Sequence, residues 1–187
     1  MASSTTKTRL IIMAILIIAG IAIVGIALNC SSCSPSEPTP QSEKAPDFTL
    51  PTMTGANITL SELEGTPVVL VFWATWCGYC STELHRLEDV AQQSAGEIKV
   101  IAIDRGESIS TVKRFFGDYE PTMIVALDET EEVFWNYSSR YSSRPGSIPF
   151  TLFVDSEGIV QYAKIGAFQS EAELWDALND VFGTTIP

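Results

Sequence analysis

The sequence is short of basic residues and of histidine. Its 187 residues include eleven Lys and Arg against twenty-three Asp and Glu, and a single histidine, His85. The stretch 46–187 holds eight of the basic residues and twenty-one of the acidic ones, a formal charge of −13 for that stretch alone. A surface of this charge repels phosphate backbones and anionic lipid headgroups. We therefore expect no nucleic-acid partner and no domain lying flat on a membrane.

Cysteines are also few. The four present form two pairs of equal spacing, Cys30 with Cys33 and Cys77 with Cys80. A zinc site built on either pair would need a second pair of ligands in the same domain, and one histidine does not supply it. We predict no metal site and no tightly bound cofactor.

One long apolar run lies near the N-terminus, over residues 10–28, and it contains no charged residue. At roughly 1.5 Å per residue a helix of this length spans about 28 Å, which matches the hydrocarbon core of a bilayer. Lys7 and Arg9 precede the run, which predicts that residues 1–9 stay in the cytoplasm and that the rest of the chain lies outside. We expect an uncleaved single-pass signal anchor. A cleaved signal peptide and a lipid attached at Cys30 are the alternatives.

The stretch 29–45 is rich in Pro and Ser and too polar to bury a core, which predicts a flexible linker between membrane and domain. Cys30 and Cys33 lie in this linker, where no helix terminus would activate a thiol. A local disulfide, a lipid attachment or an intermolecular bridge is expected there in preference to catalysis. The remaining residues, 46–187, have the length and composition of one globular domain.

The pattern along this domain alternates between strands and helices. Strands are expected at apolar runs over residues 68–72, 98–103, 122–127, 150–154 and 159–164. Helices are expected where apolar residues recur at helical spacing, over residues 77–94, 108–116, 131–137 and 170–182. The first strands are predicted to pair in parallel and the last two to form an antiparallel hairpin. The expected fold is α/β, with a central mixed sheet and helices on both faces.

Cys77 and Cys80 lie where a buried strand turns into a helix. The free N–H groups and the dipole of a helix N-terminus stabilise a thiolate, and they lower the pKa of such a thiol from about 8.5 to roughly 3.5–7.5. Cys80, one helical turn further on, can attack a mixed disulfide formed at Cys77 and release the partner. We predict a redox-active dithiol; a structural disulfide or half of a zinc site are the alternatives.

Four segments around this dithiol carry a family pattern: Ala45–Leu50, Leu60–Gly65, Val69–Cys77 and the pair Ile148–Pro149 before the strand 150–154. With them, residues 45–183 resemble the thioredoxin superfamily, and in particular its TlpA/ResA-like branch of membrane-anchored, extracytoplasmic thiol-disulfide oxidoreductases. The resemblance implies a thioredoxin fold with an N-terminal β extension.

The same resemblance implies that Pro149 is in the cis form and faces the dithiol, where the backbone beside it, at Ile148, holds a substrate chain in extended form. An X–Pro bond is cis in only about one case in twenty, so this expectation rests on the resemblance. Gly78 and Tyr79 lie between the cysteines and are expected to tune the thiolate, and Trp76, just before Cys77, is expected to support the site. The Gly-Tyr pair departs from the pairs common in the branch, which leaves the direction of electron flow open.

Glu83 matches a glutamate that the branch keeps near its active site, where it takes or donates a proton as the thiols titrate. A solvated helix residue is the alternative interpretation of Glu83. Thioredoxin has a buried aspartate where this chain has Val71, so proton management is expected to differ. His85 is expected at the surface. The segment 138–146 is expected to form a loop longer than the usual connection, in which Arg140 and Arg144 either contact a partner or are merely exposed.

Together these features predict an enzyme that reduces disulfides of exported proteins, for example apocytochrome c before haem attachment, with electrons from a membrane thiol reductant. A disulfide oxidase or isomerase of the same fold is the nearest alternative. A thiol peroxidase would need a threonine at the position of Ala74. A copper carrier would need three residues between the cysteines and a distant histidine.

Overall fold

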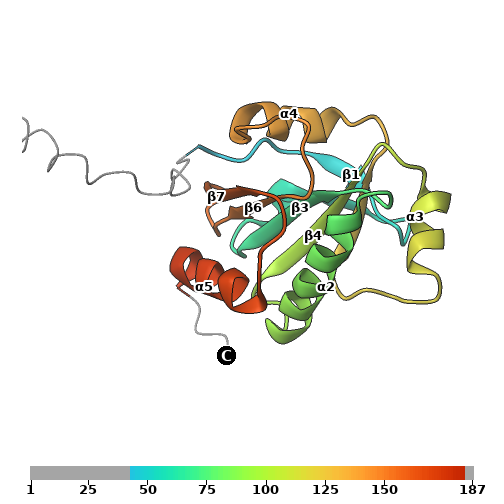
Figure 1. The fold of residues 1–187 in the computed structure, drawn as a ribbon. Coiled ribbons are helices and arrows are strands. Elements are labelled where there is room, and N and C mark those ends of the chain that lie inside the picture. Colours follow the sequence, from blue (N-terminus) through green and yellow to red (C-terminus); the bar gives the residue numbers. More distant parts are fainter. Residues whose placement is uncertain (1–42, 184–187) are drawn as a thin grey trace, which may run out of the picture. The chain divides into compact units, whose positions relative to one another are not determined.

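The centre of the molecule is a five-stranded mixed sheet with the strand order β5-β4-β3-β6-β7 (Figure 1). The computed structural model describes residues 43–183. The strands are β3 (Val68–Trp73), β4 (Lys99–Arg105), β5 (Ile124–Asp128), β6 (Phe150–Val154) and β7 (Val160–Ile165). β3, β4 and β5 pair in parallel, whereas β6 pairs antiparallel with both β3 and β7. The predicted mixed sheet is confirmed.

The middle strand β3 is buried along its whole length. Its odd-numbered residues, Val69 to Trp73, belong to the core cluster beneath helix α2 (Gly78–Gln93), and its even-numbered residues, Val68 to Phe72, belong to the cluster on the opposite face. A strand covered on both faces reads as a continuous apolar run, which is why the sequence pattern located it. β3 leads directly into residues 74–77, the loop that contains Cys77 and is called the dithiol loop below.

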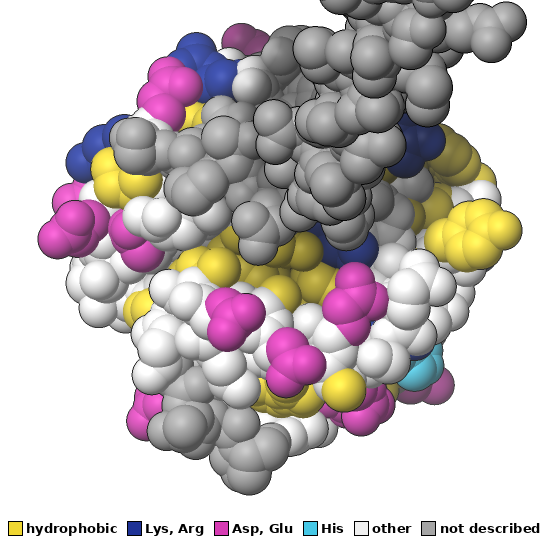
Figure 2. Space-filling model, turned by 60° about the vertical axis from the view of Figure 1, so that its left-hand side comes forward, with side chains coloured by type: hydrophobic (Ala, Val, Ile, Leu, Met, Phe, Trp, Pro, Cys, Tyr) yellow, Lys and Arg dark blue, Asp and Glu magenta, His cyan; other side chains and the backbone are white. Residues whose placement is uncertain are grey.

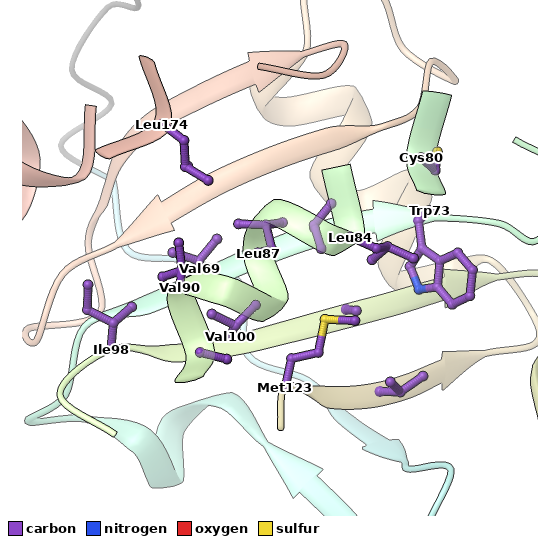
Figure 3. Packing of buried hydrophobic residues seen from close by; sticks show 14 of the residues in the cluster. Val69, Trp73, Cys80, Leu84, Leu87, Val90, Ile98, Val100, Met123 and Leu174 are labelled. Carbon is purple, nitrogen blue, oxygen red and sulfur yellow. The ribbon is translucent and has the colours of Figure 1, made fainter. Parts of the chain in front are cut away.

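Helices cover both faces of the sheet. They are α2 (Gly78–Gln93), α3 (Ile109–Phe116), α4 (Glu132–Tyr141) and α5 (Glu171–Phe182). Figure 3 shows Leu84, Leu87 and Val90 of α2 over Val69 of β3, with Leu174 of α5 in the same cluster. The opposite face is covered by α4, whose buried aromatic side chains pack on the even-numbered residues of β3.

The N-terminal β extension that the resemblance implies is present. β1 (Thr49–Pro51) and β2 (Asn57–Thr59) form an antiparallel pair, followed by the 3-10 helix η1 (Leu60–Leu63). Just after β1, Thr52 forms a bridge to Ala126 of β5. Residues 43–45 are already bonded to the domain, because the Val160 N–H donates to the Glu43 carbonyl and the Ala45 N–H donates to the Gly158 carbonyl.

Helix α4 is longer than predicted. It runs to Tyr141, so the expected helix over 131–137 was too short and residues 138–141 of the expected loop 138–146 are helical. Serine is a poor helix former in isolation. Here Ser138 is fully buried and its hydroxyl accepts the Gly146 N–H at 2.8 Å, so tertiary packing overrides the local preference. Arg140 lies on this helix and pairs with the Glu43 carboxylate at 2.6 Å.

The predicted cytoplasmic segment 1–9 and membrane helix 10–28 lie outside the described residues, together with most of the linker 29–45. Within residues 43–183 no helix has the length and apolarity that a membrane span requires. On the face of the domain shown in Figure 2, acidic side chains are scattered around a central apolar area.

Candidate active site

The two cysteines lie at the junction of β3 and α2. Cys77 is the N-cap of α2 and Cys80 is in its first turn, and their sulfurs form a disulfide. Backbone bonds fix the turn: the Cys77 N–H donates to the Ala74 carbonyl at 3.1 Å, and the Cys80 N–H donates to the Cys77 carbonyl at 3.0 Å. Cys77 is partly exposed, whereas Cys80 is fully buried. An incoming sulfur can therefore reach Cys77 and not Cys80.

Two large aromatic side chains flank Cys77 at the surface. Trp76 is 66% exposed and Tyr79 is 80% exposed. Gly78, between Cys77 and Tyr79, is exposed and has open space around it. Exposed aromatic side chains on both sides of one cysteine supply contact area to a bound chain. Cys77 thus sits in an apolar surround that is open to a polypeptide partner.

The Ile148–Pro149 peptide bond is cis, as the resemblance implies. Pro149 directly precedes β6, whose first residue, Phe150, pairs with Phe72 of β3. One further step along this antiparallel ladder brings Pro149 level with Trp73, at the end of β3 that leads to the dithiol. Pro149 is buried, and Ile148 is partly exposed and packs against both core clusters.

Glu83 is fully buried, so it is not a solvated helix residue. The Thr151 hydroxyl donates to Oε1 at 3.2 Å and the Phe168 N–H donates to Oε2 at 3.0 Å. Burial raises the pKa of this carboxyl, while these two donors and two nearby cationic side chains oppose the shift. Because Glu83 follows Cys80 by three residues on the same helix, the buried thiol and the buried carboxyl lie on one face.

The dithiol loop also bonds to the Glu107 carboxylate, which the sequence analysis did not identify as a site residue. Thr75 donates to Glu107 twice, from its N–H to Oε2 at 2.6 Å and from its hydroxyl to Oε1 at 2.7 Å. Glu107 in turn donates its own N–H to Asp104 Oδ1 at 3.2 Å.

Asp104 itself is fully buried at the end of β4, where it pairs with Trp73 of β3. Burial first, and then the neighbouring Glu107 carboxylate, raise the pKa of Asp104 to about 8. Its Oδ2 has no hydrogen-bond partner within residues 43–183. A usable signal was present in the sequence, because the carboxyl ends of parallel strands meet at one edge of a sheet and Asp104 directly follows an apolar run.

Two further positions lie where the sequence placed them. His85 is exposed on α2, with Nδ1 3.0 Å from the Ser81 carbonyl oxygen. Val71 is fully buried in the core. Residues 43–183 contain no group of three or more His, Cys, Asp or Glu arranged to hold a metal ion.

A mixed sheet with a dithiol at the start of a helix and a cis proline beside it defines a protein of the thioredoxin fold. The sequence model of the AhpC/TSA family matches residues 42–163, and the chain belongs to this family.

Its curated relatives include proteins that are named thiol-disulfide oxidoreductase ResA. The chain is 28% identical to ResA of Bacillus subtilis over 174 residues, which cover 92% of this chain and 93% of that protein. It is 30% identical to ResA of Oceanobacillus iheyensis over 144 residues, which cover 74% and 71%.

Solved structures that are similar to this chain include further thioredoxin-like proteins. A Chlorobium tepidum protein assigned as thiol:disulfide interchange protein DsbE is 26% identical with a TM-score of 0.60, covering 74% of this chain and 97% of its own. The thioredoxin lipoprotein Etrx1 of Streptococcus pneumoniae shares the fold at 23% identity with a TM-score of 0.62, covering 72% and 99%. The chain is a thiol-disulfide oxidoreductase of the ResA/DsbE type.

Proposed function

We propose that this protein reduces disulfides of exported proteins outside the cytoplasm, with Cys77 as the attacking thiolate and Cys80 as the resolving thiol. The observation that carries the proposal is the unequal exposure of the two sulfurs. Cys77 is partly exposed at a helix N-terminus, whereas Cys80 is fully buried on the same face as the buried carboxyl of Glu83. This arrangement gives the two thiols separate tasks.

In the first step the Cys77 thiolate attacks one sulfur of the substrate disulfide. A bond forms between Cys77 Sγ and that sulfur, and the other substrate sulfur leaves as a thiolate that takes a proton from solvent. The helix N-terminus favours the charged form of Cys77 before the attack. Trp76 and Tyr79 lie beside the attacked bond and supply apolar contact to the substrate chain.

In the second step Cys80 attacks Cys77 Sγ. The bond between Cys77 and the substrate breaks, the Cys77–Cys80 disulfide closes, and the substrate leaves with both of its sulfurs reduced, so two electrons pass to the substrate. Cys80 must lose its proton before it attacks. Glu83 is the acceptor in this proposal, because its raised pKa brings a buried carboxyl toward the range in which a general base works near neutral pH.

The second turnover needs a source of electrons. Extracytoplasmic compartments lack the thiol buffer of the cytoplasm, so the Cys77–Cys80 disulfide would be reduced by a membrane thiol reductant. The apolar run 10–28 supports anchoring of the domain at that membrane. The substrate class that the resemblance to the TlpA/ResA-like branch implies, and that we propose, is an exported protein with a disulfide, for example apocytochrome c before haem attachment.

The direction of electron flow is tested by the reduction potential of the full-length protein in detergent micelles. A potential near that of thioredoxin, about −270 mV, would support the reducing role, whereas a value near about −120 mV would overturn it in favour of an oxidase. Cys77→Ser should abolish insulin reduction, and Cys80→Ser should accumulate a mixed disulfide with the substrate. Insulin reduction by Cys77→Ser at the wild-type rate would contradict the assignment of the nucleophile.

Location is tested in intact cells with a maleimide that cannot cross membranes, applied after mild reduction to the variant Cys80→Ser. Labelling of Cys77 in intact cells would support an extracytoplasmic domain. Labelling that appears only after lysis would overturn it. A variant that lacks Cys30 and Cys33 is used so that Cys77 is the only free thiol.

A further inference from the structure

One four-residue segment, Asp104–Glu107, contacts the dithiol loop, residues 74–77, and is hydrogen-bonded to the cis-proline loop, residues 142–149. Glu107 accepts two hydrogen bonds from Thr75, which precedes Cys77 by two residues. Arg105 Nη1 donates to the carbonyl oxygen of Gly146 at 3.0 Å, three residues before the cis proline. The dithiol loop and the cis-proline loop come from parts of the chain about seventy residues apart. They are therefore tied to the same short segment at the end of β4.

The contact to the dithiol loop consists of two short hydrogen bonds from Thr75 to the Glu107 carboxylate. A carboxylate that accepts from both the N–H and the hydroxyl of one residue fixes the orientation as well as the position of that residue. Asp104 supports this arrangement from beneath, because its Oδ1 accepts the Glu107 N–H. With the pKa of Asp104 raised to about 8, this acid is mostly protonated at pH 7 and places little second charge beside Glu107.

The contact to the cis-proline loop is equally constrained. The Arg105 side chain is 11% exposed, and its guanidinium lies 3.9 Å from the centroid of the Phe134 ring. It also donates from Nη2 to Glu131 Oε2 at 2.6 Å, and the same oxygen accepts from the Trp135 indole N–H at 3.0 Å. Arg105 is thus fixed on the start of α4 while it holds the Gly146 carbonyl.

The geometry of the segment explains how two neighbouring residues reach opposite sides. Side chains alternate across a strand, so Asp104 lies on the α2 face of the sheet and Arg105 on the α4 face. Gly106 then turns the chain with a φ of +77°. A Cβ at Gly106 would lie 2.6 Å from Glu131 Oε1, so a larger residue there would displace the Arg105 partner.

We propose that the segment Asp104–Glu107 sets the spacing between the dithiol loop and the cis-proline loop, with Arg105 and Glu107 as positioning residues for thiol-disulfide exchange. In the proposed function, a substrate cysteine that reacts with Cys77 lies between the two loops. A misplacement of about 1 Å in such a gap lowers a reaction rate by as much as roughly 100-fold. This inference rests on exchange at Cys77, the chemistry of the proposed function, and it holds for either direction of electron flow.

The test compares two reactions of the full-length protein in detergent micelles. Exchange with a peptide disulfide needs both loops, whereas alkylation of Cys77 by iodoacetamide, measured in a Cys80→Ser background, needs only the thiolate. We expect Glu107→Gln and Arg105→Lys each to slow peptide exchange about 10-fold and to leave the alkylation rate and its pH profile within about 2-fold of the parent protein. Both residues act on the distance between the same two loops. The exchange rate of the double variant should therefore fall by a smaller factor than the product of the two single-variant factors.

Matched variants separate positioning from general damage. Thr75→Val, which removes the hydroxyl donor to Glu107, should slow exchange, and Thr75→Ser, which keeps it, should restore the parent rate. Glu64→Gln removes a carboxylate of an exposed ion pair with Lys44 and should change neither reaction. Far-ultraviolet circular dichroism checks that each variant is folded.

Unchanged peptide exchange in folded Glu107→Gln and Arg105→Lys would overturn the inference, and so would an equal fall in exchange and alkylation. Exchange is measured both from the reduced protein with a peptide disulfide and from the oxidised protein with a peptide thiol. A strongly oxidising wild-type couple would therefore overturn the proposed reducing role while the comparison of variants still decides the inference.

Discussion

Helix α2 carries two buried glutamates, five residues apart, whose environments shift their acidity in opposite directions. Glu83 accepts one N–H and one hydroxyl, and burial raises its pKa. For Glu88, burial acts in the same sense, but three donors, the N–H groups of Thr122 and Met123 and the side-chain amide of Gln92, together lower the pKa. The number of donors, and not burial alone, therefore decides the charge of each acid.

The difference matches the positions of the two acids. Glu83 lies at the dithiol end of α2, where a carboxyl that changes its protonation state is useful to the chemistry. Glu88 lies about two helical turns beyond Cys80. There a carboxylate that is charged at neutral pH holds the segment before β5 against the helix. One helix thus combines a candidate proton acceptor with a structural anchor.

The largest expected effect comes from Glu83→Gln. Gln keeps the shape of Glu83 and cannot take a proton, so we expect the attack of Cys80 to slow by about 100-fold while the attack of Cys77 keeps its rate. Stopped-flow mixing with an aromatic disulfide, whose released thiolate absorbs light, resolves the two attacks as two phases. Glu88→Gln is the matched control on the same helix. A second phase that is equally fast in Glu83→Gln and in wild type would remove Glu83 from the mechanism.

Glu88→Gln should instead reduce stability, by about 2 kcal/mol at pH 7, because Gln no longer offers a charged acceptor to the buried N–H groups. A lowered pKa in the folded state means that the stabilisation is present above the unfolded pKa of about 4.3 and is lost as pH falls through the folded pKa. Urea unfolding at pH 7 and at pH 3 checks this sign. A difference between variant and wild type that is larger at pH 3 would contradict it.

Asp104→Asn should have the reverse pH dependence. Burial raises the pKa of Asp104 to about 8 in the folded protein, against about 3.9 in the unfolded chain. The contribution of Asp104 to folding stability is therefore fully present below about pH 3.9 and is lost as the pH rises through 8. Asn keeps the acceptor for the Glu107 N–H and has no proton to lose. We expect the Tm of the variant to exceed that of wild type by about 4 °C more at pH 8.5 than at pH 4. An equal Tm difference at both pH values would show that Asp104 has an ordinary pKa.

The sequence predicted the parts of this molecule whose signals are local. The β3 run is apolar because both its faces are covered, and the dithiol lies next to it in the chain. The burial of Glu83 was not readable, because its donors, Thr151 and Phe168, come 68 and 85 residues later. Thr75 and Glu107 are 32 residues apart and meet because they follow two strands, β3 and β4, that are neighbours in the sheet. No local pattern in the sequence predicts this contact.

Thr151→Val sharpens the comparison of the two glutamates with the smallest expected effect. It removes the hydroxyl that donates to Glu83 Oε1 and leaves the Phe168 N–H, so the pKa of Glu83 should rise further. A larger fraction of Glu83 is then protonated at neutral pH, and we expect Cys80 attack at pH 7 to slow by about 3-fold and to recover at higher pH. Thr49→Val, at an exposed threonine of β1, is the matched control. A loss that does not recover with rising pH would point to disturbed packing of β6 and not to the acidity of Glu83.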